Sequence, residues 1–282
     1  MMTPATEVLV DLGPATLNVR DEGSGRPVVL MHGWSYDLHL WDELVPDLLA
    51  AGLRTVRYDQ RGHGNSPSTG PYRFDALVDD LGLLIGRLGL RQPILCGLSL
   101  GGFVAMEFAA TRPEAVAGLV LADTCPHAIE QDTRMARTIP GSAAGTATLG
   151  RWWDADHPLL PDADAAAHAR RRERFLRNDA DGLREAIAAC AERPPVTGLL
   201  PRISAPTQVI CGEHDLFFPP SLHADLAGAI PGAELTVIAG AGHISCLDRP
   251  AEFNQAVHRF LGRAGLLARP EETAGRHQRN GE

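Results

Sequence analysis

The sequence from residue 93 to residue 103 is Pro93-Ile94-Leu95-Cys96-Gly97-Leu98-Ser99-Leu100-Gly101-Gly102-Phe103. A short apolar run leads into the pattern GxSxG, and residues 101–111 then place apolar side chains three and four positions apart. This context predicts a strand, a sharp turn at Ser99 and a helix, because small residues two positions before and after the serine avoid a steric clash. Such a turn presents the Ser99 hydroxyl above the sheet and points the Leu100 N–H at any anion formed there. A glycine-rich turn without chemistry is the alternative.

Short apolar runs and longer amphipathic stretches alternate on both sides of this turn. The alternation is typical of buried parallel strands joined by helices. We predict strands at residues 7–12, 16–20, 27–31, 54–58, 93–97, 116–122, 207–211 and 234–239. We predict helices at residues 40–51, 74–88, 101–111, 221–229 and 250–261. The predicted fold is therefore α/β, with a mostly parallel sheet of eight strands flanked by helices.

Residues 125–204 interrupt the alternation. They are rich in Ala, Arg and Asp and contain no strand-like run, so they predict a helical insertion. The residues through which it is expected to pack are Trp152, Trp153, Leu159, Leu160 and Phe175. The Arg-rich run at residues 170–174 is interpreted as a solvated helix face. The predicted organisation is a core formed by residues 1–124 and 205–262, an insertion at residues 125–204, and a flexible tail at residues 263–282.

The composition excludes several classes of protein. The 282 residues are 44% hydrophobic and 22% charged, as in ordinary globular proteins. All 26 basic residues are Arg, so chemistry that needs a Lys is excluded. A formal charge of -9 argues against a nucleic-acid partner. Because the five cysteines form no CxxC pair and the chain shows neither a secretory signal nor a membrane-spanning run, we expect a cytoplasmic protein with no membrane association. The sequence leaves open whether the protein forms a homo-oligomer.

A serine hydroxyl needs a neighbouring base, and that base needs a group to orient it. The predicted strand at residues 207–211 runs into Gly212-Glu213-His214-Asp215, and the strand at residues 234–239 runs into Gly240-Ala241-Gly242-His243. Parallel strands end at one edge of a sheet, so Asp215 and His243 are predicted on the same rim as Ser99, in the chain order Ser, Asp, His. Asp123, after the strand at residues 116–122, is the alternative acid. Asp215 as a turn cap and His243 as an ordinary loop residue also remain open.

The loop after the strand at residues 27–31 is the expected source of a second oxyanion donor. It begins His32-Gly33-Trp34, and the backbone N–H of Trp34 is the candidate beside the N–H of Leu100. His32 is interpreted as a structural residue that ties this loop down by a hydrogen bond. No cofactor and no metal is predicted, because the chain has neither HExxH nor a complete dinucleotide fingerprint.

Five motifs occur in the order HGW, DQRGHGNS, GLSLGG, GEHD and GAGH, and with them the chain resembles the α/β-hydrolase superfamily across residues 16–262. Within that superfamily, residues 57–72, 96–99, 151–153 and 179–182 are similar to 3-oxoadipate enol-lactonases. That resemblance implies a helical lid over the pocket, no cofactor, and attack by the serine on an enol-lactone carbonyl. The enol-lactone carries a free carboxylate, for which the candidate partners are Arg134, Arg137 and Arg151. Trp152 and Trp153 are further candidates for substrate binding.

These observations predict a serine hydrolase that cleaves a small-molecule ester or lactone through an acyl-enzyme on Ser99. Carbon–carbon bond hydrolases resemble the chain but tend to have Asn where Leu98 stands. Cofactor-free haloperoxidases and perhydrolases usually place a proline where Ser35 stands, just after the oxyanion position. A ligand receptor of the same fold, and a lyase or cyclase that uses the pocket for proton transfer, are rivals from other classes. With His243 as base, kcat/KM is expected to fall as pH drops through about 6 to 7.

Overall fold

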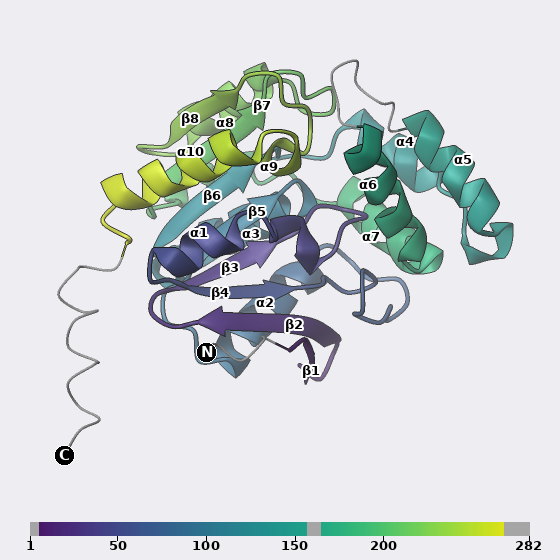
Figure 1. The fold of residues 1–282 in the computed structure, drawn as a ribbon, viewed down its shortest axis with the longest axis horizontal. Helices are drawn as coiled ribbons and strands as arrows, with labels where there is room; N and C mark the ends of the chain where they lie inside the picture. Colours follow the sequence, from purple (N-terminus) through teal and green to yellow (C-terminus); the bar gives the residue numbers. More distant parts are fainter. Residues whose placement is uncertain (1–5, 157–164, 268–282) are drawn as a thin grey trace.

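The computed structural model describes residues 6–156 and 165–267 and contains one sheet of eight strands (Figure 1). The strand order is β1-β2-β4-β3-β5-β6-β7-β8. β2 pairs antiparallel with β1 and β4, and every pairing from β4 to β8 is parallel, so the predicted mostly parallel sheet is confirmed. The strands are β1 (Val8–Asp11), β2 (Thr16–Gly23), β3 (Pro27–Met31), β4 (Arg54–Tyr58), β5 (Ile94–Leu98), β6 (Gly118–Ala122), β7 (Thr207–Gly212) and β8 (Glu234–Ile238).

Helices cover both faces of the sheet. α1 (Val45–Ala50) and α10 (Pro250–Arg263) lie over the near face in Figure 1, with α2 (Asp75–Arg87), α3 (Leu100–Thr111) and α8 (Pro220–Ala229) on the other. In β3, Val28 and Leu30 join the apolar cluster of α1 and α10, whereas Val29 and Met31 join that of α2 and α3. Alternate side chains of a strand point to opposite faces, so a strand covered on both sides is apolar throughout. None of the helices in the described ranges has the length and apolar character that a membrane span requires.

The single helix predicted at residues 40–51 is wrong. The chain forms a 3-10 turn, η1 (Leu38–Trp41), followed by α1, which begins at Val45. Pro46 lies in the first turn of α1, which is where a helix tolerates a residue without an N–H. The turn starts earlier than predicted because the Asp37 carboxylate accepts the His39 N–H at 2.9 Å.

The chain between β6 and β7 forms helices, as its composition predicts, and α4 to α7 gather at one side of the sheet (Figure 1). They are α4 (Glu130–Thr138), η3 (Ser142–Ala144), α5 (Thr146–Asp156), α6 (Ala165–Arg177), α7 (Ala180–Ala191) and η4 (Thr197–Arg202). The short α9 (Ser245–Asp248) follows β8 and belongs to the core. Phe175 and Trp153 are both buried, with ring centroids 4.6 Å apart, whereas Leu159 and Leu160 lie outside the described residues. Of the tail predicted at residues 263–282, Arg263 still belongs to α10 and Leu266 is buried, while residues 268–282 lie outside the described part.

The insertion is joined to the core by short polar contacts and by a close approach of two backbones. The Asn178 side chain accepts the Gly64 N–H at 2.9 Å and donates to the Ser35 carbonyl at 3.1 Å. A Cβ on Gly182 would lie 2.5 Å from the Gly62 carbonyl oxygen, so this approach requires glycine. These contacts fix the start of α7 against the loop that follows β4.

Candidate active site

Ser99 forms the turn between β5 and α3 in a backbone conformation that few residues adopt. Its φ is 52° and its ψ is -114°, outside the regions that a side chain favours. The Ser99 N–H donates to the Ala122 carbonyl at 2.9 Å, and the Ser99 carbonyl accepts the Phe103 N–H at 2.9 Å and the Thr124 hydroxyl at 3.0 Å. A backbone held this way costs about 1–3 kcal/mol, and such residues cluster at functional sites.

Two glycines make this turn sterically feasible. A Cβ on Gly97 would lie 2.2 Å from the Gly101 carbonyl oxygen, and a Cβ on Gly101 would lie 2.2 Å from the Met31 carbonyl oxygen. Both distances are far inside van der Waals contact with backbone atoms, which cannot rotate away. The prediction that small residues must stand two positions before and two positions after the serine is therefore confirmed.

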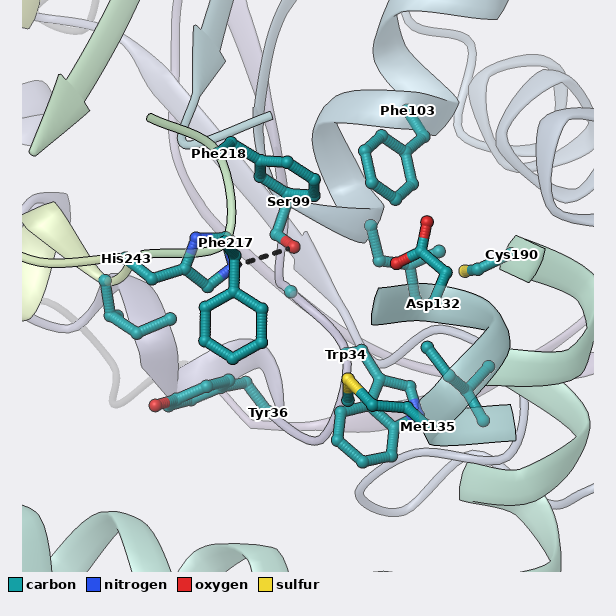
Figure 2. A pocket seen from close by; sticks show the side chains of 14 residues that line it. Trp34, Tyr36, Ser99, Phe103, Asp132, Met135, Cys190, Phe217, Phe218 and His243 are labelled. Carbon is teal, nitrogen blue, oxygen red and sulfur yellow. Dashed lines mark hydrogen bonds between the residues drawn. The ribbon is translucent and has the colours of Figure 1, made fainter. Parts of the chain in front are cut away.

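The structure brings Ser99, His243 and Asp215 together above the sheet. His243 Nε2 lies 3.1 Å from Ser99 Oγ, the contact drawn as a dashed line in Figure 2, and His243 Nδ1 lies 2.9 Å from Asp215 Oδ2. The other carboxylate oxygen of Asp215 accepts the N–H groups of Phe217 and Phe218 at 2.8 and 2.9 Å. A continuous chain of hydrogen bonds thus links the hydroxyl to a carboxylate that the backbone holds in place.

The charges of Asp215 and His243 stabilise one another. Burial opposes ionisation of Asp215, but the His243 ring and the hydrogen bonds that the carboxylate accepts outweigh it, so the pKa of Asp215 lies below its ordinary value. Burial likewise opposes protonation of His243, yet the Asp215 carboxylate outweighs that effect and raises the pKa of the ring. An ionised Asp215 can only accept, so Nδ1 carries the proton and Nε2 offers its lone pair to the Ser99 hydroxyl. This arrangement can take up the hydroxyl proton.

Asp123, the alternative acid, has different partners. Its Oδ1 accepts the Gly212 N–H at 3.0 Å, and its Oδ2 accepts the Ser245 N–H at 3.0 Å and the Ser245 hydroxyl at 2.7 Å. Burial, followed by the nearby charge of Asp215, raises the pKa of Asp123 to about 8. Asp123 therefore bonds to the end of β7 and to the loop that carries His243, and the carboxylate hydrogen-bonded to the His243 ring is Asp215.

Asp123, Asp215 and His223 are the described residues whose positions could suit a metal, since their ligand atoms lie within 4.8 Å of one another. Backbone donors already occupy these atoms. The Thr124 N–H donates to His223 Nε2 at 2.9 Å, and both aspartates accept two or more N–H groups or hydroxyls. A metal would have to displace these donors, so the three residues are better explained as a hydrogen-bonded network beneath the site.

The loop after β3 lies against the turn at Ser99. Gly33, Trp34 and Leu100 line the same cavity as Ser99, and the His32 carbonyl accepts the Gly101 N–H at 3.1 Å. His32 Nε2 accepts the Gln60 N–H at 2.9 Å, and burial lowers the pKa of this ring, which keeps it neutral. His32 thus ties the loop to the segment that follows β4, as the sequence predicts.

A cavity of about 80 Å³ opens at Ser99 and His243 (Figure 2). Its walls are mostly aromatic and aliphatic, and they come from the core and from the insertion helices α4 and α7. The side chains that matter below are Phe103, Asp132, Met135, Cys190, Phe217 and Phe218. The site is therefore an apolar pocket with its reactive groups at one wall.

The structure does not bring the predicted substrate-binding residues to this cavity. Trp153 is buried against Phe175, and Trp152 packs edge-on against Trp34 with ring centroids 5.6 Å apart. The arginine side chains proposed as carboxylate partners are all exposed: Arg134, Arg137 and Arg151. On α4 it is the buried Asp132 and Met135 that face the cavity instead. The sequence predicts a helical insertion here, but not which of its side chains would face the cavity.

Comparison with known proteins identifies the family of this chain. The alpha/beta hydrolase fold family matches residues 26–250. This chain belongs to that family. This α/β hydrolase is 31% identical to BpoC from Mycobacterium tuberculosis, provisionally named a non-heme bromoperoxidase. The aligned region covers 86% of this chain and 95% of BpoC. It is also 31% identical to 3-oxoadipate enol-lactonase 2 from Acinetobacter baylyi, with the aligned region covering 74% of this chain and 78% of the lactonase.

A solved structure extends the likeness to esterases. The malate-bound thermophilic esterase from Thermogutta terrifontis superposes on 92% of this α/β hydrolase, and on 99% of its own chain, with a TM-score of 0.79 and 30% identity. The names of these relatives cover a peroxidase, a lactonase and an esterase. The family is thus established, and the activity has to be argued from the site.

Proposed function

We propose that this α/β hydrolase is a serine hydrolase that cleaves a carboxylic ester or lactone through an acyl-enzyme on Ser99. The observation that carries the proposal is the hydrogen-bonded series Asp215, His243, Ser99 opening into an apolar cavity. Three such groups in sequence are the recurring means of activating a serine hydroxyl. The esterase and lactonase names among the relatives support the same class of reaction.

In the first half of the proposed reaction, Ser99 Oγ attacks the carbonyl carbon of the ester while His243 Nε2 takes the hydroxyl proton. Asp215 stabilises the imidazolium that results and keeps the ring oriented. The negative oxygen of the tetrahedral intermediate accepts hydrogen bonds from the backbone N–H groups of Trp34 and Leu100, the second of which begins α3. The carbon–oxygen bond to the leaving alcohol then breaks, and that alcohol takes the proton from His243.

In the second half, His243 removes a proton from water, and the hydroxide attacks the acyl group on Ser99. The acid leaves and Ser99 recovers its proton from the ring, so the net reaction consumes one water and needs no cofactor. We assign residues 125–204 the role of a lid, since α4 and α7 supply Asp132, Met135, Ile187 and Cys190 to the cavity wall. Closing the pocket with apolar walls limits competing reactions.

A second candidate function is perhydrolysis, which the identity to BpoC favours. The same acyl-enzyme would react with hydrogen peroxide in place of water, giving a peracid and free Ser99. A peracid oxidises bromide, so peroxide-dependent bromination of a phenolic dye, tested in the presence of a short carboxylic acid, measures this reaction. A bromination rate above the ester hydrolysis rate would make peroxide the preferred acceptor.

The decisive experiment combines covalent labelling with turnover of p-nitrophenyl esters of short acids. Short acids suit a cavity of about 80 Å³, because an apolar cavity of about 150 Å³ holds a benzene molecule. A fluorophosphonate should label the wild type and not Ser99→Ala, and kcat of that variant should fall by roughly 10⁴ to 10⁶. The control is Ser221→Ala, which alters an exposed serine on α8 and should keep both labelling and turnover.

The same variants separate the rival classes. A folded Ser99→Ala protein with ordinary turnover would refute the acyl-enzyme and would suit a lyase or cyclase that uses only the base. Labelling of the wild type followed by a single turnover, without further product, would instead identify a receptor of the same fold.

A further inference from the structure

One carboxylate, that of Asp132, lies in the otherwise apolar wall of the cavity and forms an ion pair with an arginine behind that wall. Asp132 Oδ2 on α4 and Arg193 Nη1, two residues past the end of α7, lie 2.7 Å apart, and each residue is only 6% exposed. Asp132 Oδ2 also accepts the Ile129 N–H at 3.1 Å. Buried ion pairs are weak stabilisers by themselves, so the position of this pair beside Ser99 calls for an explanation.

The two partners are not equivalent with respect to the cavity. Asp132 lines it, and Figure 2 places its carboxylate between Phe103 and Cys190. Arg193 is not among the residues that line this cavity: its guanidinium carbon lies 3.6 Å from the centre of the Phe103 ring, and the guanidinium also donates to the carbonyls of Cys190 and His127. The pair therefore turns its negative end to the cavity and holds its positive end behind an aromatic ring.

We propose that Asp132 makes this pocket selective for substrates whose acyl group is uncharged, an inference that rests on the proposed ester or lactone hydrolysis. A carboxylate on the acyl group would enter a cavity with little water and meet a second carboxylate there. The described lining residues offer no guanidinium to balance it, and Asp132 already occupies Arg193. An uncharged acyl group loses nothing by comparison, because the remaining walls are aromatic and aliphatic.

This selectivity separates the protein from an enzyme for a carboxylate-bearing enol-lactone. The arginines expected to bind that carboxylate are exposed outside the cavity, and the acidic residue on the same helix faces inward. The substrate class that fits is an ester or lactone whose acyl group is short and carries no charge.

The test compares two p-nitrophenyl esters of similar length, the neutral butyrate and the anionic hemisuccinate. The wild type should show a kcat/KM for the butyrate at least about 100-fold above that for the hemisuccinate. In Asp132→Asn the like charge is removed and Arg193 is released, so the ratio of hemisuccinate to butyrate should rise about tenfold or more. A merely structural ion pair would instead lower both activities together and leave the ratio where it was.

Two further variants keep the test decisive. Asp132→Leu/Arg193→Met removes both charges and tends to preserve folding where one unpaired charge would not, and it should also raise the ratio. Glu130→Gln changes an exposed acid on the same helix and should leave the ratio unchanged. A wild type that prefers the hemisuccinate, or a ratio unmoved in both Asp132 variants, would overturn the proposal. Failure of the wild type to hydrolyse the butyrate at all would count against the proposed function instead.

Discussion

Replacing Asp215 by Asn tests the proposed relay at its most constrained atom. Two backbone N–H groups point at Asp215 Oδ1, those of Phe217 at 2.8 Å and Phe218 at 2.9 Å. An asparagine would keep its carbonyl oxygen there, because its NH₂ group cannot accept them. The amide nitrogen then takes the place of Oδ2, 2.9 Å from His243 Nδ1. It can only donate, so Nδ1 becomes an acceptor and the ring proton moves to Nε2, which faces Ser99 Oγ at 3.1 Å.

A ring that carries its proton on Nε2 cannot take one from the serine. The wrong tautomer in a serine triad costs about 10⁴ in kcat, or about 5.4 kcal/mol of transition-state stabilisation. We therefore expect Asp215→Asn to lower kcat for p-nitrophenyl butyrate by about that factor, with little change in KM. The Asp215 charge also raises the pKa of His243, so the residual activity of Asp215→Asn should fall with decreasing pH at a lower midpoint than the wild-type activity does.

The control is the neighbouring carboxylate. Asp123→Asn leaves the contact with His243 intact but removes one of two oxygens that accept backbone N–H groups. It should therefore cost about 1–3 kcal/mol of unfolding free energy, seen as a lower melting temperature, and far less activity than Asp215→Asn. An Asp215→Asn protein within tenfold of wild-type kcat, or a larger loss in Asp123→Asn, would refute the assignment of Asp215 as the orienting acid.

Two other predictions follow from the site and its support. Because only neutral His243 accepts a proton and its pKa is raised above the ordinary value of about 6.5, kcat/KM should fall with decreasing pH at a midpoint above that value; a profile that stays flat to about pH 5 would contradict the role of base. Gly101→Ala would place a methyl group 2.2 Å from the Met31 carbonyl oxygen and should lower the unfolding free energy by about 1–3 kcal/mol, measured in a thermal melt. The control Gly86→Ala adds a methyl group in open space on α2 and should raise the unfolding free energy by about 0.5–1 kcal/mol. Equal effects of the two variants would argue against a packing limit at the turn.

The core of the fold follows from local patterns in the sequence. β3 occupies the residues predicted for it, because a parallel strand covered on both faces needs an uninterrupted apolar run between polar turns. β4 also lies where predicted, although its sequence mixes polar and apolar residues. The turn at Ser99 was predictable for a related reason, since its steric demands fall on glycines at fixed spacing. The juxtaposition of Asp215 and His243 with the serine follows from the common edge at which parallel strands end.

The walls of the cavity could not be predicted in the same way. Asp132 and Met135 are one turn apart on α4 and both are buried, whereas the sequence indicates only that residues 125–204 are helical. Which buried side chains meet the serine depends on how α4 and α7 pack on the core, a tertiary property with no periodic signal. Phe217 and Phe218 were within reach of sequence reasoning, since they lie two and three positions after Asp215, but their rings are placed by the same packing.

The contacts of Trp34 couple two parts of the molecule that are often treated as exchangeable modules. Its indole N–H donates to the Leu183 carbonyl of α7 at 2.9 Å, and Trp34 also lines the cavity at Ser99. In a chimera that received a relative's insertion helices without Trp34 and without glycine at positions 62 and 182, we expect the loop after β3 to shift relative to Ser99. Substitutions in α7 are therefore constrained by two contacts with the core, at Leu183 and Gly182, that lie outside the cavity lining.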